Sequence, residues 1–448
     1  MTLWESCVKR RRVVLIRPPT NRWRLYRWYW PLGSREAPLG LLYIASYLAD
    51  KGYDVTILDG ENLKEEEVIS KIGDLCPDVV GVTSTTFSFF DASKLIKNVR
   101  RLLPSALLLM GGPHVSALPR DTLEKIPALD GGVFGEGEET LLEIVTGKSV
   151  NGIAGLAWRD KNGIIRLNPK RPLSTDLDRY RLNWDLLSGF PNSYQPAWQS
   201  RQKNRVISLV TSRGCSFSCI FCAGSCVHGK VRRAHSPLYI VNMMCELFKR
   251  FGSTVFYFHD DHFTLNDEWL EEFCDRLIHL GDIFRWSCAS RVESLNDKIL
   301  RTMRQAGCYQ IGVGVESGSE NILRWLAKGT TTDIMEKGIR RIHLAGMETK
   351  VYLMLGTPQE TIGDVTKTLR LVSRLPIDHV QVVYFTPLPG SAAYNSYQTT
   401  PRQWLHMNLL NPMTKSSLPN WMLRLLEFGI YAYVYGRSTG NPSRYSSL

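Results

Sequence analysis

No part of this sequence is apolar for long enough to cross a membrane as a helix, which takes roughly 20 residues. The longest candidate, residues 425–436, is shorter and contains Glu427. The beginning of the chain is basic, but its first apolar run, 13–16, is too short for the core of a secretory signal peptide. We therefore expect a cytoplasmic protein without a transmembrane segment, with peripheral contact to a membrane left open.

Cysteine is also sparse, with ten residues in a chain of 448. A secreted disulfide scaffold is shorter and denser in cysteine. Four of the ten cysteines lie within 215–226, and the others are scattered. Such clustering in a long chain favours a metal or redox site in a reducing compartment.

Acidic residues are outnumbered, 43 against 55 Lys and Arg, which gives a formal net charge of +12. Nucleic acid, an anionic membrane surface, or anionic cofactors and substrates would each account for this excess, and so would an ordinary solvated surface. The densest cluster is the basic run 9–12, followed by an aromatic and basic segment at 22–30. Such a segment can stack on bases, sit at a lipid interface or line an apolar pocket.

The first part of the chain alternates short β-rich apolar runs with helical patterns, which is typical of a parallel, doubly wound sheet. The predicted strands are 13–17, 55–59, 79–84, 107–111 and 132–134. The predicted helices are 39–51, 65–75, 91–103, 118–126 and 138–145. Five such strands suit a flavodoxin-like order, whose ligand site lies past the carboxyl ends of the strands.

Small or polar residues follow three of these strands, where a ligand can approach the backbone and helix N-termini favour anionic groups. They are Ser84 and Thr85 after the third strand, Gly111, Gly112 and His114 after the fourth, and Gly135, Glu136 and Gly137 after the fifth. Glycine-rich turns occur in every doubly wound sheet, so these loops alone leave a purely structural role open.

A second alternating region begins near residue 205. Its predicted strands are 206–211, 254–259, 284–289, 310–315, 349–355 and 379–385. Its predicted helices are 238–251, 267–280, 295–305, 320–326, 332–345 and 362–375. Six β/α repeats predict a partial (β/α)6 barrel of the TIM type, in which chemistry belongs at the carboxyl ends of the strands.

Four segments follow from this pattern. We expect the flavodoxin-like domain over 10–150, a β-hairpin and linker over 151–200, the partial barrel over 201–395, and a short helical C-terminal tail over 396–448. The predicted fold class is therefore α/β, with a doubly wound sheet followed by a partial barrel.

The cysteine cluster lies directly after the first barrel strand. Cys215, Cys219 and Cys222 have the spacing C-x3-C-x2-C, and a short loop can fold three thiolates around one [4Fe–4S] cubane. The fourth iron would then have no protein ligand and could bind a substrate. A zinc site with Cys226 or His228 as fourth ligand is the competing interpretation, although no second C-x2-C pair occurs.

This cysteine motif, with Phe221 before its last cysteine, resembles the signature of the radical S-adenosylmethionine (SAM) enzymes. Later segments resemble the same family strand by strand: 258–263, 290–292, 312–319, 353–358 and 385–390. The resemblance implies that the open iron binds SAM and that reductive cleavage yields a 5′-deoxyadenosyl radical. The candidates that it implies for contacts with SAM or substrate are Asp260, Asp261, Arg291, Glu316 and Ser317. For Asp260, Asp261 and Glu316 the alternative is a solvated carboxylate at a strand end, and a functional role is favoured for Glu316.

A five-stranded parallel domain before such a barrel resembles the cobalamin-binding domain of the cobalamin-dependent radical SAM enzymes. The loops after the fourth and fifth strands carry the resemblance, together with 38–42. Many cobalamin proteins carry D-x-H-x-x-G after the first strand, whose His ligates cobalt, but here 17–20 contain no His. The resemblance therefore implies bound cobalamin without that lower ligand, and His114 is expected to shape its turn or the pocket for the nucleotide tail.

The leading functional hypothesis is methylation of an unactivated carbon, with methylcobalamin as the methyl donor. A non-methylating radical SAM cyclase or oxidoreductase is the alternative, and a cobalamin or iron–sulfur sensor is the non-enzymatic one. RNA methylthiolation would need further N-terminal cysteines and a C-terminal β-barrel, which argues against a nucleic-acid partner.

The expected partners are a small-molecule substrate and an external electron donor of the flavodoxin or ferredoxin type. Aromatic residues of the N-terminal segment and tail hint at a large apolar substrate, a lipid or a polycycle, unless they simply pack on the barrel.

Overall fold

The computed structural model describes residues 4, 12–21, 24, 35–194, 206–397, 400, 403–404 and 407–438. The aromatic residues predicted to act together at 23–30 lie outside this part of the chain. The molecule divides into two compact units, which we describe separately. The first comprises Met1–Tyr194, Cys222–Gly229 and Leu388–Met407, and the second comprises Gln195–Phe221, Lys230–Pro387 and Asn408–Leu448. The boundaries predicted at 150, 200 and 395 stay predictions.

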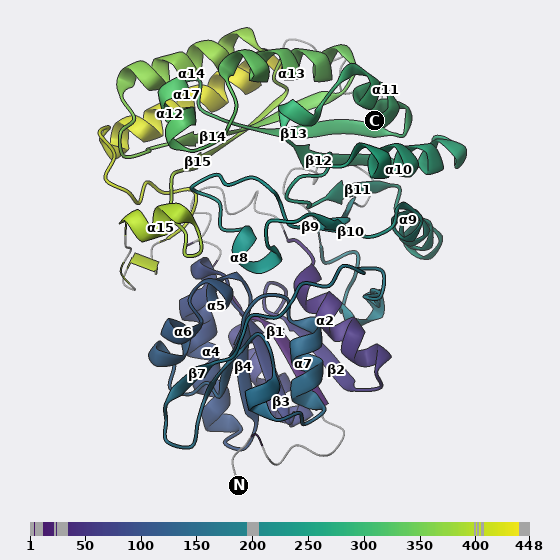
Figure 1. The fold of residues 1–448 in the computed structure, drawn as a ribbon, viewed down its shortest axis with the longest axis vertical. Helices are drawn as coiled ribbons and strands as arrows, with labels where there is room; N and C mark the ends of the chain where they lie inside the picture. Colours follow the sequence, from purple (N-terminus) through teal and green to yellow (C-terminus); the bar gives the residue numbers. More distant parts are fainter. Residues whose placement is uncertain are drawn as a thin grey trace. The chain divides into compact units, whose positions relative to one another are not determined.

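A parallel five-stranded sheet forms the core of the first unit (Figure 1). Its strands are β1 (Arg12–Arg17), β2 (Asp54–Asp59), β3 (Val79–Thr83), β4 (Leu107–Gly111) and β5 (Gly131–Val133). They lie in the order β2-β1-β3-β4-β5, which confirms the predicted flavodoxin-like arrangement. Residues 13–16 of the central β1 are all buried, since helices cover both faces of the sheet.

Helices connect these strands and cover both faces of the sheet. They are α2 (Leu39–Asp50), α3 (Glu65–Leu75), α4 (Phe89–Leu102), α5 (Pro113–Ala117), α6 (Pro119–Lys125) and α7 (Glu138–Val145). Helix α2 packs beside α7, and α3 packs beside α4. The helix predicted over 118–126 is present as α6, and Pro113 begins a further short helix, α5, that was not predicted.

The predicted hairpin is part of this sheet. Its strands β6 (Leu156–Arg159) and β7 (Ile165–Leu167) pair with each other, and β6 also pairs antiparallel with β5. The sheet therefore has seven strands. Two short helices distant in sequence belong to the same unit: α8 (Ser225–His228) and α15 (Ala392–Tyr397).

Six parallel strands form the sheet of the second unit. They are β8 (Val206–Leu209), β11 (Val255–Phe258), β12 (Arg285–Ser290), β13 (Cys308–Glu316), β14 (Glu348–Leu355) and β15 (His379–Tyr384). They follow one another in chain order, from β8 at one edge to β15 at the other. The two edge strands do not pair with each other, so the predicted partial barrel is confirmed as an open, curled sheet.

Helices follow the strands of this sheet (Figure 1). They are α9 (Pro237–Phe251), α10 (Asp267–His279), α11 (Asp297–Gln305), α12 (Glu320–Trp325), α13 (Thr332–Leu344) and α14 (Ile362–Arg374). Side chains cap several N-termini: Ser236 accepts from the backbone N–H of Tyr239, and Asn266 accepts from that of Trp269. A small antiparallel pair, β9 (Ser212–Arg213) with β10 (Arg233–Ala234), lies beside the first strand.

The helical tail predicted at the C-terminus is present as α17 (Asn420–Ser438). It packs against the edge strand β15, where the Tyr431 hydroxyl accepts a hydrogen bond from the Val382 N–H at 3.1 Å. The buried Glu427 accepts another from the Tyr384 hydroxyl at 2.6 Å. The helix thus partners backbone groups that an open sheet leaves exposed at its edge. In the described residues, no helix is both long and apolar enough to span a bilayer.

Candidate active site

The three motif cysteines lie in one loop after β9. The loop starts at Gly214, whose φ of 92° is the left-handed region that favours glycine, and the β9–β10 pair closes its base. Cys215 and Cys219 are half-buried, and Cys222 is exposed. Within the described ranges, no three His, Cys, Asp or Glu side chains are close enough together to hold a metal ion. The loop therefore supplies the donor atoms, while their convergence on one point is not seen.

Asp260 fixes the chain that leads into this loop. Its carboxylate accepts hydrogen bonds from the Thr211 backbone N–H at 2.7 Å, from the Thr211 hydroxyl at 2.5 Å and from the Ser212 hydroxyl. Burial raises the pKa of Asp260, and the hydrogen bonds from Ser212 and Thr211 oppose the shift. Asp260, predicted as a contact for SAM or substrate, thus uses both oxygens to hold the end of β11 to the chain before the cysteines.

Arg291 joins the loop to the end of β12. Its guanidinium stacks over the Phe217 ring, 3.8 Å from the ring centroid, and Nη1 donates to the Cys219 sulfur at 3.6 Å. It also donates to the Lys328 carbonyl and forms an ion pair with Glu293 at 3.2 Å. A buried, permanently charged donor therefore touches one of the three candidate thiolate ligands.

Asp261 is exposed, next to the buried Asp260. Burial raises the pKa of the Cys215 thiol, and the negative charges of Asp261 and Cys219 add to that shift. The backbone hydrogen bond from Phe217 and the charge of Arg291 act in the opposite direction. The loop environment by itself therefore does not favour the thiolate of Cys215, which a bound iron ion would stabilise.

Glu316 ends the long strand β13 in a strained conformation. Its φ is 62°, unusual for any residue other than glycine, and the strand register shifts beside it. The carboxylate is buried and pairs with the Lys328 ammonium at 2.9 Å. Gly314 makes room for this pair, since a Cβ there would lie 2.6 Å from both charged groups. Strain together with a buried ion pair marks this strand end as a functional candidate.

Lys328 is the residue that sequence reasoning missed. It lies in the loop after α12, where no periodic pattern or motif distinguishes it from other lysines. By contrast, the predicted Ser317 is fully buried and bonds within the chain, to the Thr368 hydroxyl at 3.3 Å and to the Ser319 N–H at 3.2 Å. Ser317 therefore shapes the turn after β13.

In the first unit, the loops after β3 and β4 lie together. The Ser84 carbonyl accepts the His114 N–H at 3.1 Å, and a Cβ at Gly112 would lie 2.8 Å from the same carbonyl. Gly112 has a φ of 95°, so glycine is required there by backbone strain as well as by space. Thr85 is exposed and shares a capping box with Ser88. Gly111 is the last residue of β4 and directly precedes the turn that contains Gly112 and His114.

His114 is buried in this turn. Its Nδ1 lies 3.1 Å from the Thr86 hydroxyl, and its ring packs against Phe89 and Trp404. Burial lowers the pKa of His114 to about 3, and the nearby Lys125 charge acts in the same direction. The imidazole is therefore neutral at physiological pH. This packing agrees with the expected role in shaping the turn.

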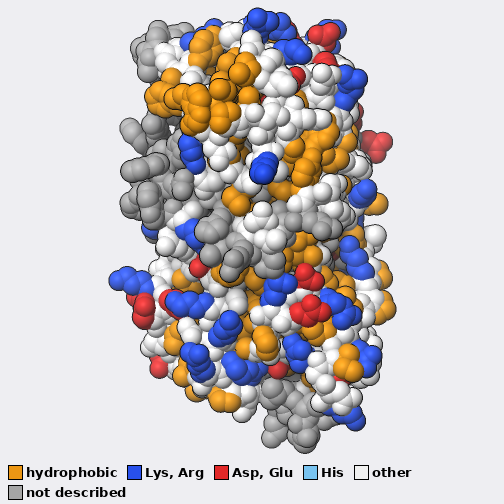
Figure 2. Space-filling view, turned by 90° about the vertical axis from the view of Figure 1, so that its left-hand side faces the viewer, with side chains coloured by type: hydrophobic (Ala, Val, Ile, Leu, Met, Phe, Trp, Pro, Cys, Tyr) orange, Lys and Arg blue, Asp and Glu red, His pale blue; other side chains and the backbone are white. Residues whose placement is uncertain are grey.

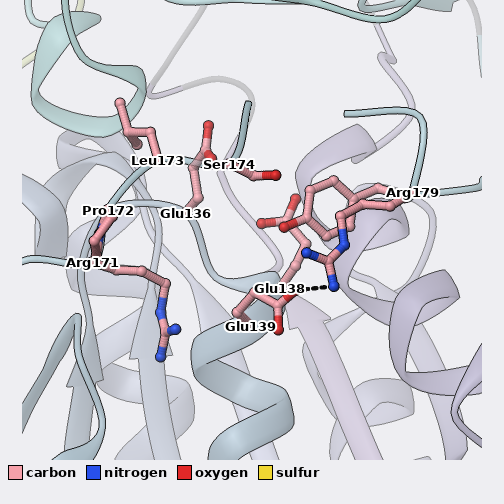
Figure 3. A pocket seen from close by; sticks show the side chains of 9 residues that line it. Glu136, Glu138, Glu139, Arg171, Pro172, Leu173, Ser174 and Arg179 are labelled. Atoms are coloured by element: carbon pink, nitrogen blue, oxygen red, sulfur yellow. Dashed lines mark ion pairs between the residues drawn. The ribbon is translucent and has the colours of Figure 1, made fainter. Parts of the chain in front are cut away.

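The loop after β5 borders a cavity of about 260 Å³ (Figure 3). Glu136 lines it from the loop after β5, and Glu138 and Glu139 from the start of α7, with Arg171 and Arg179 on either side of these glutamates. Both arginines already pair with carboxylates, Arg179 with Glu139 at 3.0 Å and Arg171 with Glu143. The cavity is smaller than the roughly 300–1,000 Å³ of most small-ligand sites and rich in acids, so it suits a hydrogen-bond donor better than a phosphate.

Glycine is needed at positions 135 and 137 for different reasons. A Cβ at Gly135 would meet open space, but its φ of 80° favours glycine. A Cβ at Gly137 would lie 2.8 Å from the Ile44 side chain, so this glycine allows α2 to approach the loop. The space directly beside Gly135 is therefore open.

Helix α8, which starts three residues after Cys222, packs on α5 within the first unit. His228 of α8 lies 3.2 Å from the Glu136 carboxylate. The Cys226 sulfur lies 4.0 Å from the Pro113 carbonyl. The two residues that could have completed a zinc site thus contact the loops after β4 and β5.

These residues fit the groups that the sequence predicts. Three thiols in one loop, with an arginine donor at Cys219 and no competing acid or imidazole inside the loop, suit an iron–sulfur cluster better than zinc. The glycine edge at the carboxyl ends of β4 and β5 suits a broad, flat cofactor such as cobalamin. The 260 Å³ cavity could accept only a small part of it.

Comparison with known proteins finds two domain families in this chain. Residues 31–145 match the B12 binding domain family, and residues 209–372 match the radical SAM superfamily. An uncharacterised methyltransferase of Pyrococcus horikoshii is 32% identical over 90% of this chain and 88% of its own length. The chain belongs to the cobalamin-dependent radical SAM family.

Other relatives are more distant. The anaerobic magnesium-protoporphyrin IX monomethyl ester cyclase of Rubrivivax gelatinosus is 28% identical over 79% of this chain, which spans 65% of the cyclase. The structure of the radical SAM methyltransferase TsrM from Kitasatospora setae, with cobalamin and a [4Fe–4S] cluster bound, matches with a TM-score of 0.70. It is 20% identical and covers 87% of this chain and 75% of TsrM. At this identity the likeness shows the shared fold.

Proposed function

We propose that this cobalamin-dependent radical SAM enzyme methylates an unactivated carbon of a small molecule. The observation that carries the proposal is the presence, in one chain, of a three-cysteine loop on a partial barrel and a glycine edge on a flavodoxin-like sheet. The Pyrococcus relative, named as a methyltransferase and similar over nearly its whole length, supports methyl transfer.

When bound, the reduced cluster would supply the electron that cleaves SAM, and cobalamin would supply a methyl carrier. The chain's own residues hold and orient these groups. Cys215, Cys219 and Cys222 would ligate the cluster. Arg291 holds Cys219 by a hydrogen bond, and Asp260 holds the chain that precedes the loop.

The buried pair of Glu316 and Lys328 is proposed to bind the polar end of SAM. The Glu316 carboxylate and the Lys328 ammonium are 2.9 Å apart. When an amino acid binds, the carboxylate can pair with its amino group and the ammonium with its carboxylate, so the net charge of the site does not change. The exposed Asp261 is a proposed contact for SAM or substrate at the same end of the barrel.

Ser84, Thr85, the glycines of the β4 and β5 loops, and Glu136 are proposed to border cobalamin. His114 is proposed to support their turn, since its ring packs on Phe89 and Trp404. Described aromatic residues of the tail either pack, as Trp404 does, or face outward, as Phe428 does. An apolar substrate therefore stays a prediction based on sequence alone.

The decisive experiment uses anaerobically reconstituted protein with cobalamin, a strong reductant and SAM carrying a deuterated methyl group. We expect S-adenosylhomocysteine and a deuterated methyl group on protein-bound cobalamin, both detected by mass spectrometry. Deoxyadenosine without S-adenosylhomocysteine would favour the cyclase or oxidoreductase alternative. The Rubrivivax relative, which is named as a cyclase, is the reason to test for this outcome. Cofactor binding without any cleavage of SAM would favour the sensor.

A further inference from the structure

Helix α17 is apolar on both of its sides. One side, with Leu423, Ile430 and Val434, is buried in the second unit. The opposite side carries Trp421, Leu425 and Phe428, which are 62%, 61% and 72% exposed, followed by Tyr433 at 40%. A helix that is apolar all round normally has cover on both sides. Figure 2 shows hydrophobic side chains gathered on the side of this unit where α14 and α17 lie.

The neighbouring helix α14 presents a basic outer surface. The end of α17 reaches it, because Tyr433 and Arg437 both donate to the Ser373 carbonyl, at 2.9 and 3.0 Å. The exposed charged residues of α14 and the tail segment 407–438 are all basic: Lys367, Arg370, Arg374, Lys415 and Arg437. The two carboxylates of these helices, Asp364 and Glu427, are 7% and 4% exposed. We call the exposed residues of both helices the α14–α17 face.

We propose that the α14–α17 face lies on an anionic lipid bilayer. Exposed Trp, Phe, Leu and Tyr on one helix, with Lys and Arg beside them and no exposed acid, is the composition of helices that bind in the plane of a membrane interface. Basic residues near such a surface add attraction to anionic headgroups. The helix is not apolar enough to span the bilayer, so it would rest on the surface.

A second copy of the chain is the other possible cover, and the charges disfavour it. A two-fold interface brings the same surface of both copies together. Arg374 already pairs with Glu336 of α13 at 2.9 Å. Each copy would still contribute Lys367, Arg370 and Arg437 without an exposed carboxylate from α14 or α17 to pair with them. Like charges would then accumulate at the rim of the interface, whereas an anionic bilayer neutralises them.

The first test removes apolar area. Anaerobically reconstituted full-length protein is sedimented with phosphatidylcholine vesicles that contain or lack phosphatidylglycerol. We expect binding only to the anionic vesicles, and a loss of about tenfold or more in affinity for the double variant Leu425→Gln, Phe428→Gln. Leu238→Gln is the control, because Leu238 is 47% exposed on α9, which follows β8 at the opposite edge of the sheet.

The second test removes charge. The double variant Lys367→Gln, Arg370→Gln should lose about fivefold in affinity per charge for the anionic vesicles. Lys249→Gln, Arg301→Gln removes the same net charge from exposed positions of α9 and α11 and should bind as the parent does. The proposal would be overturned if the parent did not bind anionic vesicles. It would also be overturned if the Lys367→Gln, Arg370→Gln variant bound them with the same affinity as the Lys249→Gln, Arg301→Gln variant. The third result that would overturn it is a concentration-dependent dimer, measured by analytical ultracentrifugation, that the Leu425 and Phe428 changes convert to monomer.

Discussion

At the scale of single residues, Arg291 connects the cysteine loop with the end of β12. Its hydrogen bond to the Cys219 sulfur and its positive charge both stabilise a more reduced, more negative cluster. Arg291→Gln should therefore lower the reduction potential, by on the order of 100 mV for one charge about 6 Å away at an effective dielectric constant of 20. The measurement is a redox titration followed by electron paramagnetic resonance.

Arg291→Lys provides the control for this prediction, because it keeps the charge and loses the planar stack on Phe217. Its potential should lie between those of the parent and the Gln variant. An unchanged potential in Arg291→Gln, at full iron content, would show that the contact with Cys219 does not influence the cluster.

His114 gives the first unit a pH-dependent stability. Its pKa is about 3 in the folded state, against about 6.5 when unfolded, so the unfolded chain binds the proton more readily. Stability is therefore fully present above pH 6.5 and is lost as the pH falls towards 3. Between pH 7 and pH 5 this loss amounts to about 2 kcal/mol.

Denaturant unfolding at the two pH values tests this prediction. His114→Gln should remove this part of the pH dependence, whatever it does to stability at pH 7. His279→Gln, at an exposed position on α10, should leave it unchanged. The prediction fails if parent and His114→Gln lose the same free energy between pH 7 and pH 5.

At the scale of elements, α17 completes the open edge of the second sheet. Tyr431→Phe removes the acceptor of the Val382 N–H at the outer edge of β15, where no further strand pairs. We expect a loss of about 1 kcal/mol in the free energy of unfolding, the usual effect of one lost hydrogen bond.

Tyr433→Phe is the matched control on the same helix. Its hydroxyl also bonds to the chain, but at an exposed position where water can replace the bond. Its change in unfolding free energy should stay within about 0.5 kcal/mol. Equal losses for both variants would mean that the edge strand gains nothing particular from Tyr431.

At the scale of the whole molecule, the two predicted cofactor sites depend on different sheets. The cysteine loop follows the first strand of the second unit, although its last cysteine, Cys222, is grouped with the first unit. The glycine edge belongs to the sheet of the first unit. The triple variant Cys215→Ala, Cys219→Ala, Cys222→Ala should therefore lose its iron and SAM cleavage while it still binds cobalamin. Iron analysis and the absorbance of bound cobalamin measure the two outcomes separately. Retained iron would contradict the proposed ligand set.

Much of the fold was predictable because its strands are short, apolar and separated by helices. The runs at 13–16 and 107–110 are buried on both faces, and such runs show their structure locally. The helix at 119–125 was predicted, whereas the short helix that begins at Pro113 had no periodic pattern to indicate it. The pairing of β6 with β5 had no local signal, since a hairpin's sequence does not say which edge strand it joins.

The sequence by itself determined the spacing of the three thiols and the succession of strands and helices along the chain. Both are set by residues that are neighbours in the sequence. Only the tertiary structure decided the partners of those residues: Asp260 with Thr211, Glu316 with Lys328, and His228 with Glu136. Such pairs join chain segments up to 92 residues apart. Their contacts arise from the packing of whole strands and helices, and no spacing along the chain encodes them.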